Sequence, residues 1–188
     1  MKVIEAAKVI FSKRQGNQVD VLFRCPRASD ASAMRGYINT LSLERTFIRQ
    51  QGEQISLEEE EKYLDSLLNK ISEQRAVQLL AFHRDHLIGI AGVEMQTKTE
   101  AHVGILAISV AKEWRRQGVG KLLMNAVLQE AVHSLPSLQI ITLSVHSTNS
   151  TAIQLYRKCD FHEWGRLPKG TKHQEEYVDL VHMYKTVR

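Results

Sequence analysis

The chain has 188 residues, of which 43% are hydrophobic and 24% charged, and its formal net charge is +4. These values are ordinary for a globular protein, and no apolar run approaches the roughly 20 residues needed to span a bilayer. The opening stretch MKVIEAAKVIFSK lacks both an uninterrupted apolar core and a small-residue cleavage site, so it does not read as a signal peptide. We therefore expect a cytoplasmic protein without a membrane partner, folded as one domain over residues 1–188.

The positive charge should attract an anion, whether nucleic acid, an acidic surface or a phosphorylated cofactor. Basic residues are not interleaved with aromatic ones, as they are in single-strand and RNA readers, so nucleic acid is not an expected partner. The eight histidines are scattered, and Cys25 and Cys159 lie far apart. We therefore expect neither a metal site nor a disulfide.

The first 44 residues predict two strands and a helix. Residues 8–26 read as two short strands around a turn at residues 15–17. Helical spacing of apolar residues then covers residues 29–44, and Ser29 or Asp30 would cap this helix.

A second helix is predicted over residues 56–71. Ser56 and Glu59 fit the capping-box pattern, and acidic residues favour the positive end of a helix dipole. We interpret the four-glutamate run at residues 58–61 as a solvated helix start, not a metal site.

Three strands and a long helix come next. Residues 76–83, 87–95 and 102–110 read as an antiparallel meander, whose first two strands are separated by a turn at residues 84–86. Apolar residues then recur every three to four positions from Val119 until Ser134 and Pro136 end the helix.

The last quarter predicts a strand, a helix and a strand pair. Residues 138–146 are rich in β-branched residues and suggest a strand buried on both faces. Asn149 or Ser150 would cap a helix through residues 152–159, and the tail supplies two final strands, residues 161–167 and 176–186. Strand and helix alternate in the second half of the chain, which implies a partly parallel sheet with helices packed on it.

The stretch RRQGVGKL joins the third meander strand to the long helix. Gly118 and Gly120 allow close approach of backbone to a ligand, and the first amides of the helix have no intrahelical partner. Such a turn can cradle phosphate, and the charges of Arg115, Arg116 and Lys121 favour a di- or polyphosphate. The alternative is a plain strand-to-helix turn with its arginines in solvent.

Two familiar phosphate motifs do not fit this stretch. A Walker-type loop would need glycine in place of Arg115 and Ser or Thr in place of Leu122, and a dinucleotide fingerprint would need a third glycine at Leu123. The turn would therefore be a short pyrophosphate turn of another kind.

The segment ILAISVAKEWRRQGVGKLLMNAVLQEAV resembles the acetyl-CoA-binding core of the GNAT superfamily of N-acetyltransferases. That core has a strand, a turn of the form Arg/Gln-x-x-Gly-x-Gly/Ala, and a long helix. Arg115, Gly118 and Gly120 match the turn.

A second segment, VHSTNSTAIQLYRKCDF, is similar to the next motif of the superfamily. Its pattern of strand, Asn, helix, Tyr and closing Phe is met by Asn149, Tyr156 and Phe161. Asp160 departs from the pattern, since the superfamily commonly has glycine there, but aspartate tolerates the left-handed backbone better than most residues. The two motifs together cover residues 102–161.

The resemblance implies an α/β fold with a mixed, mostly antiparallel sheet, a V-shaped opening between its central strands, and helices on both faces. In the superfamily a β-bulge at this opening aims an amide at the acetyl carbonyl, although no bulge can be recognised in this sequence.

The resemblance also implies acetyl-CoA as cosubstrate, without a metal. Backbone around Ile108, Ser109 and Val110 would pair with the pantetheine arm, and Asn149 would contact it, cap a helix, or both. The residues expected around the pyrophosphate are Arg115, Arg116, Gln117, Gly118, Val119, Gly120 and Lys121.

Direct acetyl transfer calls for an acid at the departing thiolate and a base at the amine. The resemblance places Tyr156 as the acid, and the alternative is a core aromatic residue on an amphipathic helix. For the base, Glu94 is the first candidate and His102 the second. The alternative for Glu94 is a solvent-facing strand residue, and for His102 a histidine at a strand edge. A water chain to bulk solvent would need no dedicated base. Ser144 stands where some members that acetylate protein N-termini have glutamate, and serine is no base at neutral pH without help.

The expected function is therefore transfer of an acetyl group from acetyl-CoA to a primary amine, first of all of a small molecule. A protein N-terminus or a lysine is the alternative acceptor, and residues 35–65 and 164–178 would build the acceptor pocket. From another class, a non-catalytic acyl-CoA-binding regulatory module would keep the fold and lose the chemistry. Members of the superfamily often dimerise, so a homodimer is one option.

Overall fold

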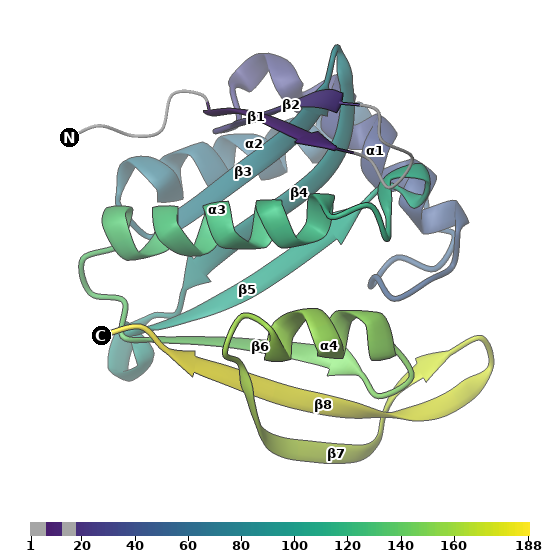
Figure 1. Ribbon diagram of the computed structural model, residues 1–188, viewed down its shortest axis with the longest axis vertical. Coiled ribbons are helices and arrows are strands. Elements are labelled where there is room, and N and C mark those ends of the chain that lie inside the picture. The colour runs from purple at the N-terminus through teal and green to yellow at the C-terminus, as the bar shows by residue number, and fades with distance from the viewer. Residues whose placement is uncertain (1–6, 13–17) are drawn as a thin grey trace.

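The computed structural model describes residues 7–12 and 18–188, so the turn predicted at residues 15–17 lies outside the described residues (Figure 1). Eight strands are described: β1 (Ala7–Ser12), β2 (Gln18–Arg24), β3 (Ala76–His83), β4 (His86–Met95), β5 (Val103–Val110), β6 (Ile140–His146), β7 (His162–His173) and β8 (Glu176–Thr186). The α-helices are α1 (Ala31–Leu43), α2 (Leu57–Ser72), α3 (Val119–Ser134) and α4 (Ser150–Arg157). Three short 3-10 turns are η1 (Ala28–Asp30), η2 (Lys98–Glu100) and η3 (Lys112–Trp114).

The strands form one sheet in the order β1-β2-β3-β4-β5-β6-β8-β7. Every neighbouring pair is antiparallel except β5 and β6, which are joined by α3 and run parallel. The predicted meander and the partly parallel second half are both confirmed.

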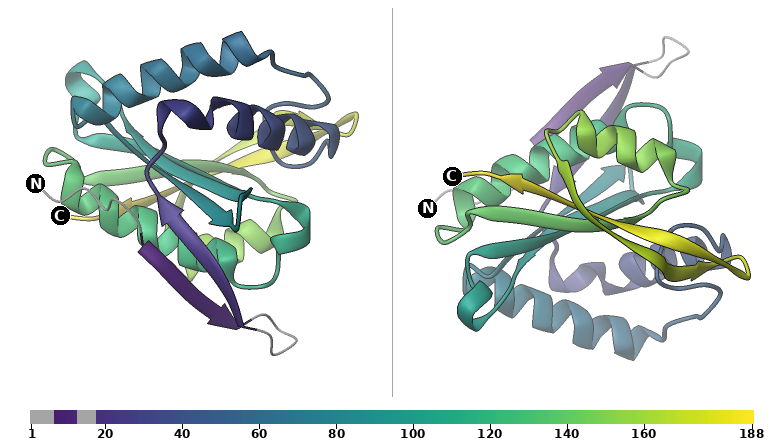
Figure 2. Two further views of the ribbon diagram at one scale, coloured as in Figure 1. Left: turned by 90° about the horizontal axis from the view of Figure 1, so that it is seen from above. Right: turned by 90° about the horizontal axis from the view of Figure 1, so that it is seen from below.

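Helices cover both faces of the sheet (Figure 2). On one face Leu64 and Leu67 of α2 and Met34 of α1 pack against Leu80 and Phe82 of β3. The other face carries α3 and α4, and its larger core is built from the opposite side of the same strands. We call these faces the α1/α2 face and the α3/α4 face.

The sheet opens between β5 and β6 (Figure 1). The two strands pair only over Val103–Ile140, Gly104–Ile141 and Ile105–Thr142. Beyond these pairs β5 continues to Val110 along β4, while β6 continues to His146 along β8. The V-shaped opening between the central strands is therefore confirmed.

No bulge on β5 accompanies this opening within strands β4 and β5, which are fully described. Their register runs unbroken from Gly89–Val110 to Met95–Gly104. The irregularity nearest to it lies on the other edge of β4, where the pairing with β3 shifts between Ala81 and Phe82. Shortened pairing with β6, and not a bulge, forms the opening here.

The prediction that the strand at residues 138–146 is buried on both faces was wrong. Ile141, Leu143 and Val145 are buried toward α3 and α4, whereas Ser144 is exposed on the α1/α2 face. The opposite face of β6 has no helix packed on it, so its side chains alternate between core and surface.

The starts of α2 and α4 agree with the predicted caps, whereas the start of α1 does not. Ser56 and Glu59 form the expected capping box of α2, and the Asn149 side chain accepts from the Ala152 amide at the start of α4. Glu60, in contrast, is buried at 5% exposure, so the four-glutamate run is not solvated throughout. Asp30 precedes α1 but makes no side-chain cap bond to the helix.

Asp30 instead ties the end of β2 to the start of α1. Its two carboxylate oxygens accept from Nη1 and Nη2 of Arg24 at 2.6 and 2.7 Å, and one of them also accepts from the Arg27 amide. Arg24 lies over the ring of Phe82, and both members of the pair are nearly buried. Burial alone would raise the pKa of the Asp30 carboxyl, but Arg24 and the Arg27 amide outweigh it and hold that pKa below its ordinary value.

We expect Asp30→Ala to lower the free energy of unfolding by about 3 kcal/mol, because it leaves a buried guanidinium without its partner. Urea unfolding at pH 7 measures the change, and Asp65→Ala on the exposed face of α2 is the matched control. Because the folded pKa of Asp30 is depressed, the stabilisation should be present above the unfolded pKa of about 3.9 and lost as the pH falls through the folded pKa. Equal effects of the two variants at pH 7 would contradict the role of this pair.

Among the described helices, none combines the length and the apolar composition that crossing a membrane requires.

Candidate active site

The turn before α3 exposes a run of unpartnered backbone amides. Gly118 is the N-cap of α3, with φ of 98° and no side-chain cap bond, and Arg116 also has a positive φ of 57°. Among the described residues, the amides of residues 116–120 have no hydrogen-bond acceptor. Five consecutive N–H groups at a helix start form a concave donor set suited to an anion.

The turn is open on the side of Gly118. A Cβ placed on Gly118 would meet no atom within 4 Å, so the turn faces open space. A Cβ on Gly120 would lie 3.7 Å from Leu155 of α4 and from Val110 of β5. The amides therefore lie between the end of β5 and α4, beside the opening of the sheet.

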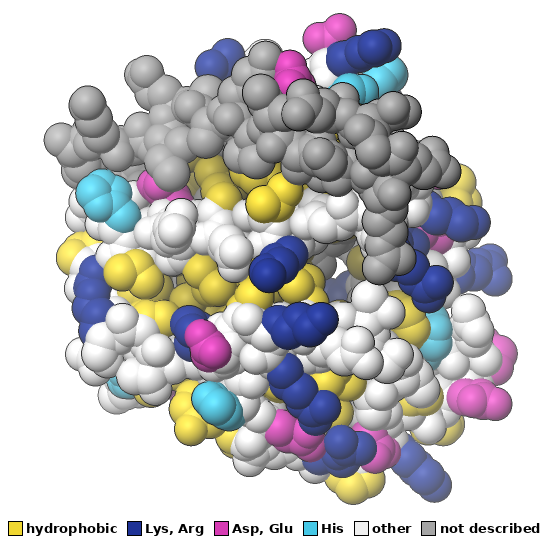
Figure 3. Space-filling view, in the orientation of Figure 1, with side chains coloured by type: hydrophobic (Ala, Val, Ile, Leu, Met, Phe, Trp, Pro, Cys, Tyr) yellow, Lys and Arg dark blue, Asp and Glu magenta, His cyan; other side chains and the backbone are white. Residues whose placement is uncertain are grey.

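The three cations of the turn have different surroundings. Arg115 is engaged within the protein: its Nη2 lies 2.7 Å from the Glu44 carboxylate at the end of α1, and its Nε donates to the Val110 carbonyl at 2.8 Å. Arg116 and Lys121 are exposed and form no ion pair with any described residue. Figure 3 shows Lys and Arg side chains gathered over the face that carries α3 and α4.

The end of β5 leads from the opening of the sheet to this turn. Ile108 and Val110 pack against the core on the α3/α4 face, while Ser109 points to the other side, where its Oγ lies 3.0 Å from the Tyr37 hydroxyl. Because pairing with β6 stops at Ile105, the backbone of residues 106–110 faces the opening along one edge. An extended ligand can add there as a strand would.

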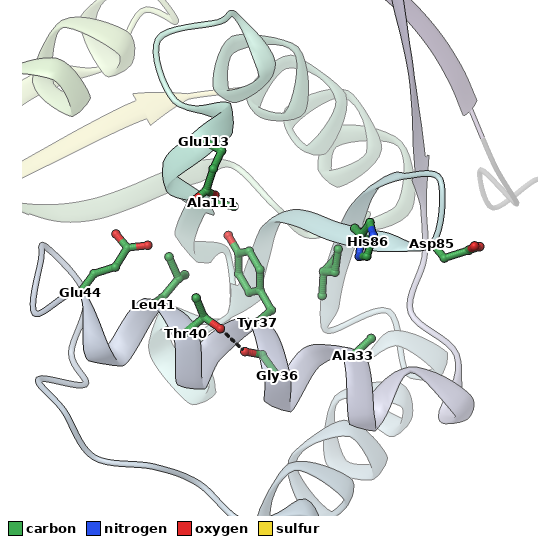
Figure 4. A pocket seen from close by; sticks show the side chains of 11 residues that line it. Ala33, Gly36, Tyr37, Thr40, Leu41, Glu44, Asp85, His86, Ala111 and Glu113 are labelled. Carbon is green, nitrogen blue, oxygen red and sulfur yellow. Dashed lines mark hydrogen bonds between the residues drawn. The ribbon is translucent and has the colours of Figure 1, made fainter.

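A cavity of about 320 Å³ lies on the α1 side of this strand end (Figure 4). Tyr37 points into it from α1, toward Ala111. Glu44, Asp85 and Glu113 are among the residues that line it, with His86 as the one basic residue, so this cavity does not suit a phosphate.

Tyr156 lies in the core between α4 and the sheet. It is 8% exposed, and its ring is tilted against that of Phe161 at a centroid distance of 6.0 Å. Burial raises the pKa of Tyr156 to about 12, so the hydroxyl keeps its proton throughout the neutral range. The chain after α4 turns through Asp160 with φ of 63°, which confirms that aspartate takes the left-handed conformation there, and the Phe161 amide donates to the Tyr156 carbonyl.

The structure places Glu94 in the last row before the opening and His102 at the closed end of the sheet. Glu94 lies on β4 opposite Ile105, where β5 and β6 are still paired, and its carboxylate is 2.6 Å from Nζ of Lys70. The carbonyl of His102 accepts from the amides of Gln139 and Ile140, at the closed end of the sheet.

The structure instead brings Ser144 together with a residue that sequence reasoning did not single out. Ser144 Oγ lies 2.9 Å from Nδ1 of His182 on β8. His182 is one of eight scattered histidines and stands 38 residues from Ser144, so only the pairing of β6 with β8 reveals the contact.

A sheet that splays beside a turn of unpartnered amides is the arrangement that the resemblance to N-acetyltransferases implies. The chain belongs to the Acetyltransferase (GNAT) family, whose model matches residues 40–161.

The relatives agree with this assignment. N-alpha-acetyltransferase 60 of Danio rerio is 28% identical over 126 residues, which are 57% of this chain and 52% of the relative. The L-amino acid N-acetyltransferase AaaT of Escherichia coli is 29% identical over 107 residues, 56% of this chain and 65% of the relative. The chain thus spans about half to two thirds of the length of the curated relatives it matches.

Solved structures show the same fold. A GNAT-family acetyltransferase from Streptococcus pneumoniae superposes with a TM-score of 0.82 at 28% identity, covering 89% of this chain and 99% of that one. The structure of yncA from Salmonella typhimurium with its cofactor acetyl-CoA gives a TM-score of 0.77 at 14% identity, over 89% of this chain and 94% of that one.

Proposed function

We propose that this chain is an acetyl-CoA-dependent N-acetyltransferase that moves the acetyl group directly to a primary amine. The observation that carries the proposal is the run of five unpartnered amides at residues 116–120, placed beside the opening between β5 and β6. The yncA structure with acetyl-CoA supports it through the shared fold.

The residues of the turn divide the binding of the cofactor between them. The backbone of residues 116–120 supplies donors for the pyrophosphate, and the exposed Arg116 and Lys121 supply charge. Arg115 holds the turn against Glu44 and the end of β5, and so positions the amides without offering its guanidinium. Asn149 is occupied as the cap of α4, which fixes the helix that carries Tyr156.

Acetyl-CoA supplies the thioester, and the chain supplies orientation and proton transfer. Backbone along residues 106–110 would align the pantetheine arm in the opening of the sheet. The Tyr156 hydroxyl, still protonated at neutral pH, would give a proton to the departing thiolate.

For the acceptor we propose the primary amine of a small molecule, with an L-amino acid as the first probe. The names of the relatives include an L-amino acid N-acetyltransferase and an N-alpha-acetyltransferase, whose common chemistry is an α-amino group. A protein N-terminus is the second candidate, favoured by large side chains exposed on β5 and on the β7–β8 hairpin: Ile105, Trp164, Leu167, Tyr177 and Tyr184.

We expect acetyl-CoA at 100 times its Kd to stabilise the protein by about 2.7 kcal/mol, which raises the Tm by about 5 to 10 °C. Differential scanning fluorimetry measures the shift, with CoA, ATP and NAD as comparison ligands. A response to CoA species alone supports the proposed turn. No shift with millimolar acetyl-CoA would contradict both the enzyme and a non-catalytic CoA-binding module.

The enzyme and the binding module are separated by turnover. CoA release is followed with a thiol reagent in the presence of acetyl-CoA and either single L-amino acids or heptapeptides with a free N-terminus. Release that depends on the amine establishes the enzyme and ranks the two acceptor classes. Binding without release for any amine would favour the module.

A further inference from the structure

We propose that Ser144 and His182 form the proton-accepting pair of the reaction, with Ser144 facing the acceptor amine and His182 receiving the proton through it. This inference rests on the proposed function and assigns the base that it leaves open.

Strand register puts the pair at the start of the sheet opening. The last pair between β5 and β6 is Ile105–Thr142, so Ser144 is the next residue of β6 on the α1/α2 face beyond the point of separation. Ser144 and His182 are direct partners in the pairing of β6 with β8, and directly opposed residues point to the same face.

The floor beside the pair is built from small side chains. Gly92 of β4 is paired with Ala107 of β5, and Ala107 is the next residue of β5 on this face after Ile105. A Cβ on Gly92 would come within 2.9 Å of the Val77 carbonyl, so a side chain does not fit there. The two residues of this row that precede Ser144 across the opening therefore carry no side chain larger than a methyl group, so neither can reach over Ser144.

The contact has the geometry of a proton relay. Ser144 Oγ and His182 Nδ1 are 2.9 Å apart, a normal hydrogen-bond distance. With Nδ1 as acceptor, the serine hydroxyl donates its proton to the imidazole. A lone pair of the serine oxygen is then free to accept a proton from the acceptor amine. Serine thereby gains the neighbouring base that it lacks by itself.

A bulge sets a third side chain against the imidazole. The pairing of β7 with β8 shifts between Glu163 and Gly165, so Trp164 is the extra residue. Its ring lies 5.5 Å from that of His182, although Trp164 is 61% exposed. Bulges of this kind re-aim a side chain, and here the indole restricts the imidazole on the side away from Ser144.

The proposed step is balanced. As the amine nitrogen bonds to the thioester carbonyl carbon, the C–S bond breaks and the nitrogen loses one proton. That proton passes to Ser144 Oγ while the serine proton moves to His182 Nδ1, and the thiolate takes the Tyr156 proton. His182 then releases its proton to solvent, and Tyr156 regains one from solvent.

The test compares His182→Ala and His182→Asn with the unchanged enzyme, using acetyl-CoA and the L-amino acid or heptapeptide that reacts fastest. Asparagine keeps a polar atom near the Nδ1 position but cannot carry the proton. Both variants should lose about 100-fold in kcat, with KM for acetyl-CoA within about twofold. Added imidazole should raise the rate of His182→Ala at least about tenfold. It should not raise the rate of Tyr156→Phe.

His162→Asn is the matched control, because His162 lies on β7 against Tyr184, one row from the pair on the same face. It should stay within about twofold of the unchanged enzyme. Ser144→Ala should lose about tenfold, and Ser144→Thr should recover most of that loss.

Each further outcome overturns a different statement. Full activity of His182→Asn, or no response of His182→Ala to imidazole, would show that the pair only joins β6 to β8 and would overturn the relay. No CoA release by the unchanged enzyme with any amine would overturn the proposed function itself. A fluorimetric Tm and an acetyl-CoA shift for each variant distinguish a lost proton acceptor from a lost fold.

Discussion

Replacing Tyr156 by phenylalanine should lower kcat by about 1,000-fold while changing KM for acetyl-CoA by no more than about twofold. The ring would keep its packing against Phe161, so only the hydroxyl is removed. Because burial raises the pKa of Tyr156 to about 12, this hydroxyl still carries its proton at every pH at which the protein would be assayed. A positioned acid typically contributes between about 100-fold and 10,000-fold. Steady-state CoA release measures both constants.

Tyr37→Phe provides the comparison, because Tyr37 is also buried and burial raises its pKa as well. Its hydroxyl bonds to Ser109 on the α1 side of β5, away from α4. We expect it to cost less than about fivefold in kcat. If Tyr156→Phe and Tyr37→Phe lose the same modest factor, Tyr156 is a core aromatic residue and the thiolate leaves without its help.

Local patterns predicted most of the elements because each depends on neighbouring residues. Capping residues indicated α2 and α4, and apolar runs separated by turn residues indicated β3 and β4. The exposed side of β6 could not be predicted in this way. Its β-branched residues suit a strand buried on either one face or two, and the number of helices that pack on it is a tertiary property.

The same limit applies to the site. Gly118 and Gly120 identify the turn because their conformational freedom is a local requirement. Glu94 looked available in the sequence, but the fold brings Lys70 of α2 to its carboxylate. His182 carried no local signal, because it meets Ser144 only through strand pairing.

The role of Arg115 also needed the fold. Next to two glycines, its guanidinium suggested a phosphate ligand, yet Glu44 lies 71 positions earlier in the chain and receives it. The structure thus separates a cation that positions the turn from Arg116 and Lys121, which remain exposed beside the amides. A test of cofactor binding should therefore change the backbone of the turn before α3, and not the arginine side chains.

Gly118→Asp should weaken acetyl-CoA binding by at least about 100-fold, equivalent to about 2.7 kcal/mol. A side chain at this position would project into the open space in front of the amides, where the pyrophosphate is proposed to lie. The carboxylate would repel that anion and compete with it for the same N–H donors. Titration calorimetry with CoA measures the Kd directly and does not depend on the acceptor.

Gly118→Asn separates charge from backbone strain. Position 118 has φ of 98°, and asparagine and aspartate both tolerate positive φ better than other side chains, at nearly equal volume. The asparagine variant should therefore pay the same conformational cost and lose about tenfold or less. Equal losses in the two variants would mean that shape alone matters at this position and that no anion sits against the amides. A larger loss for aspartate that shrinks as salt is added would mark the turn as the phosphate cradle, because screening weakens a charge repulsion but not a steric clash.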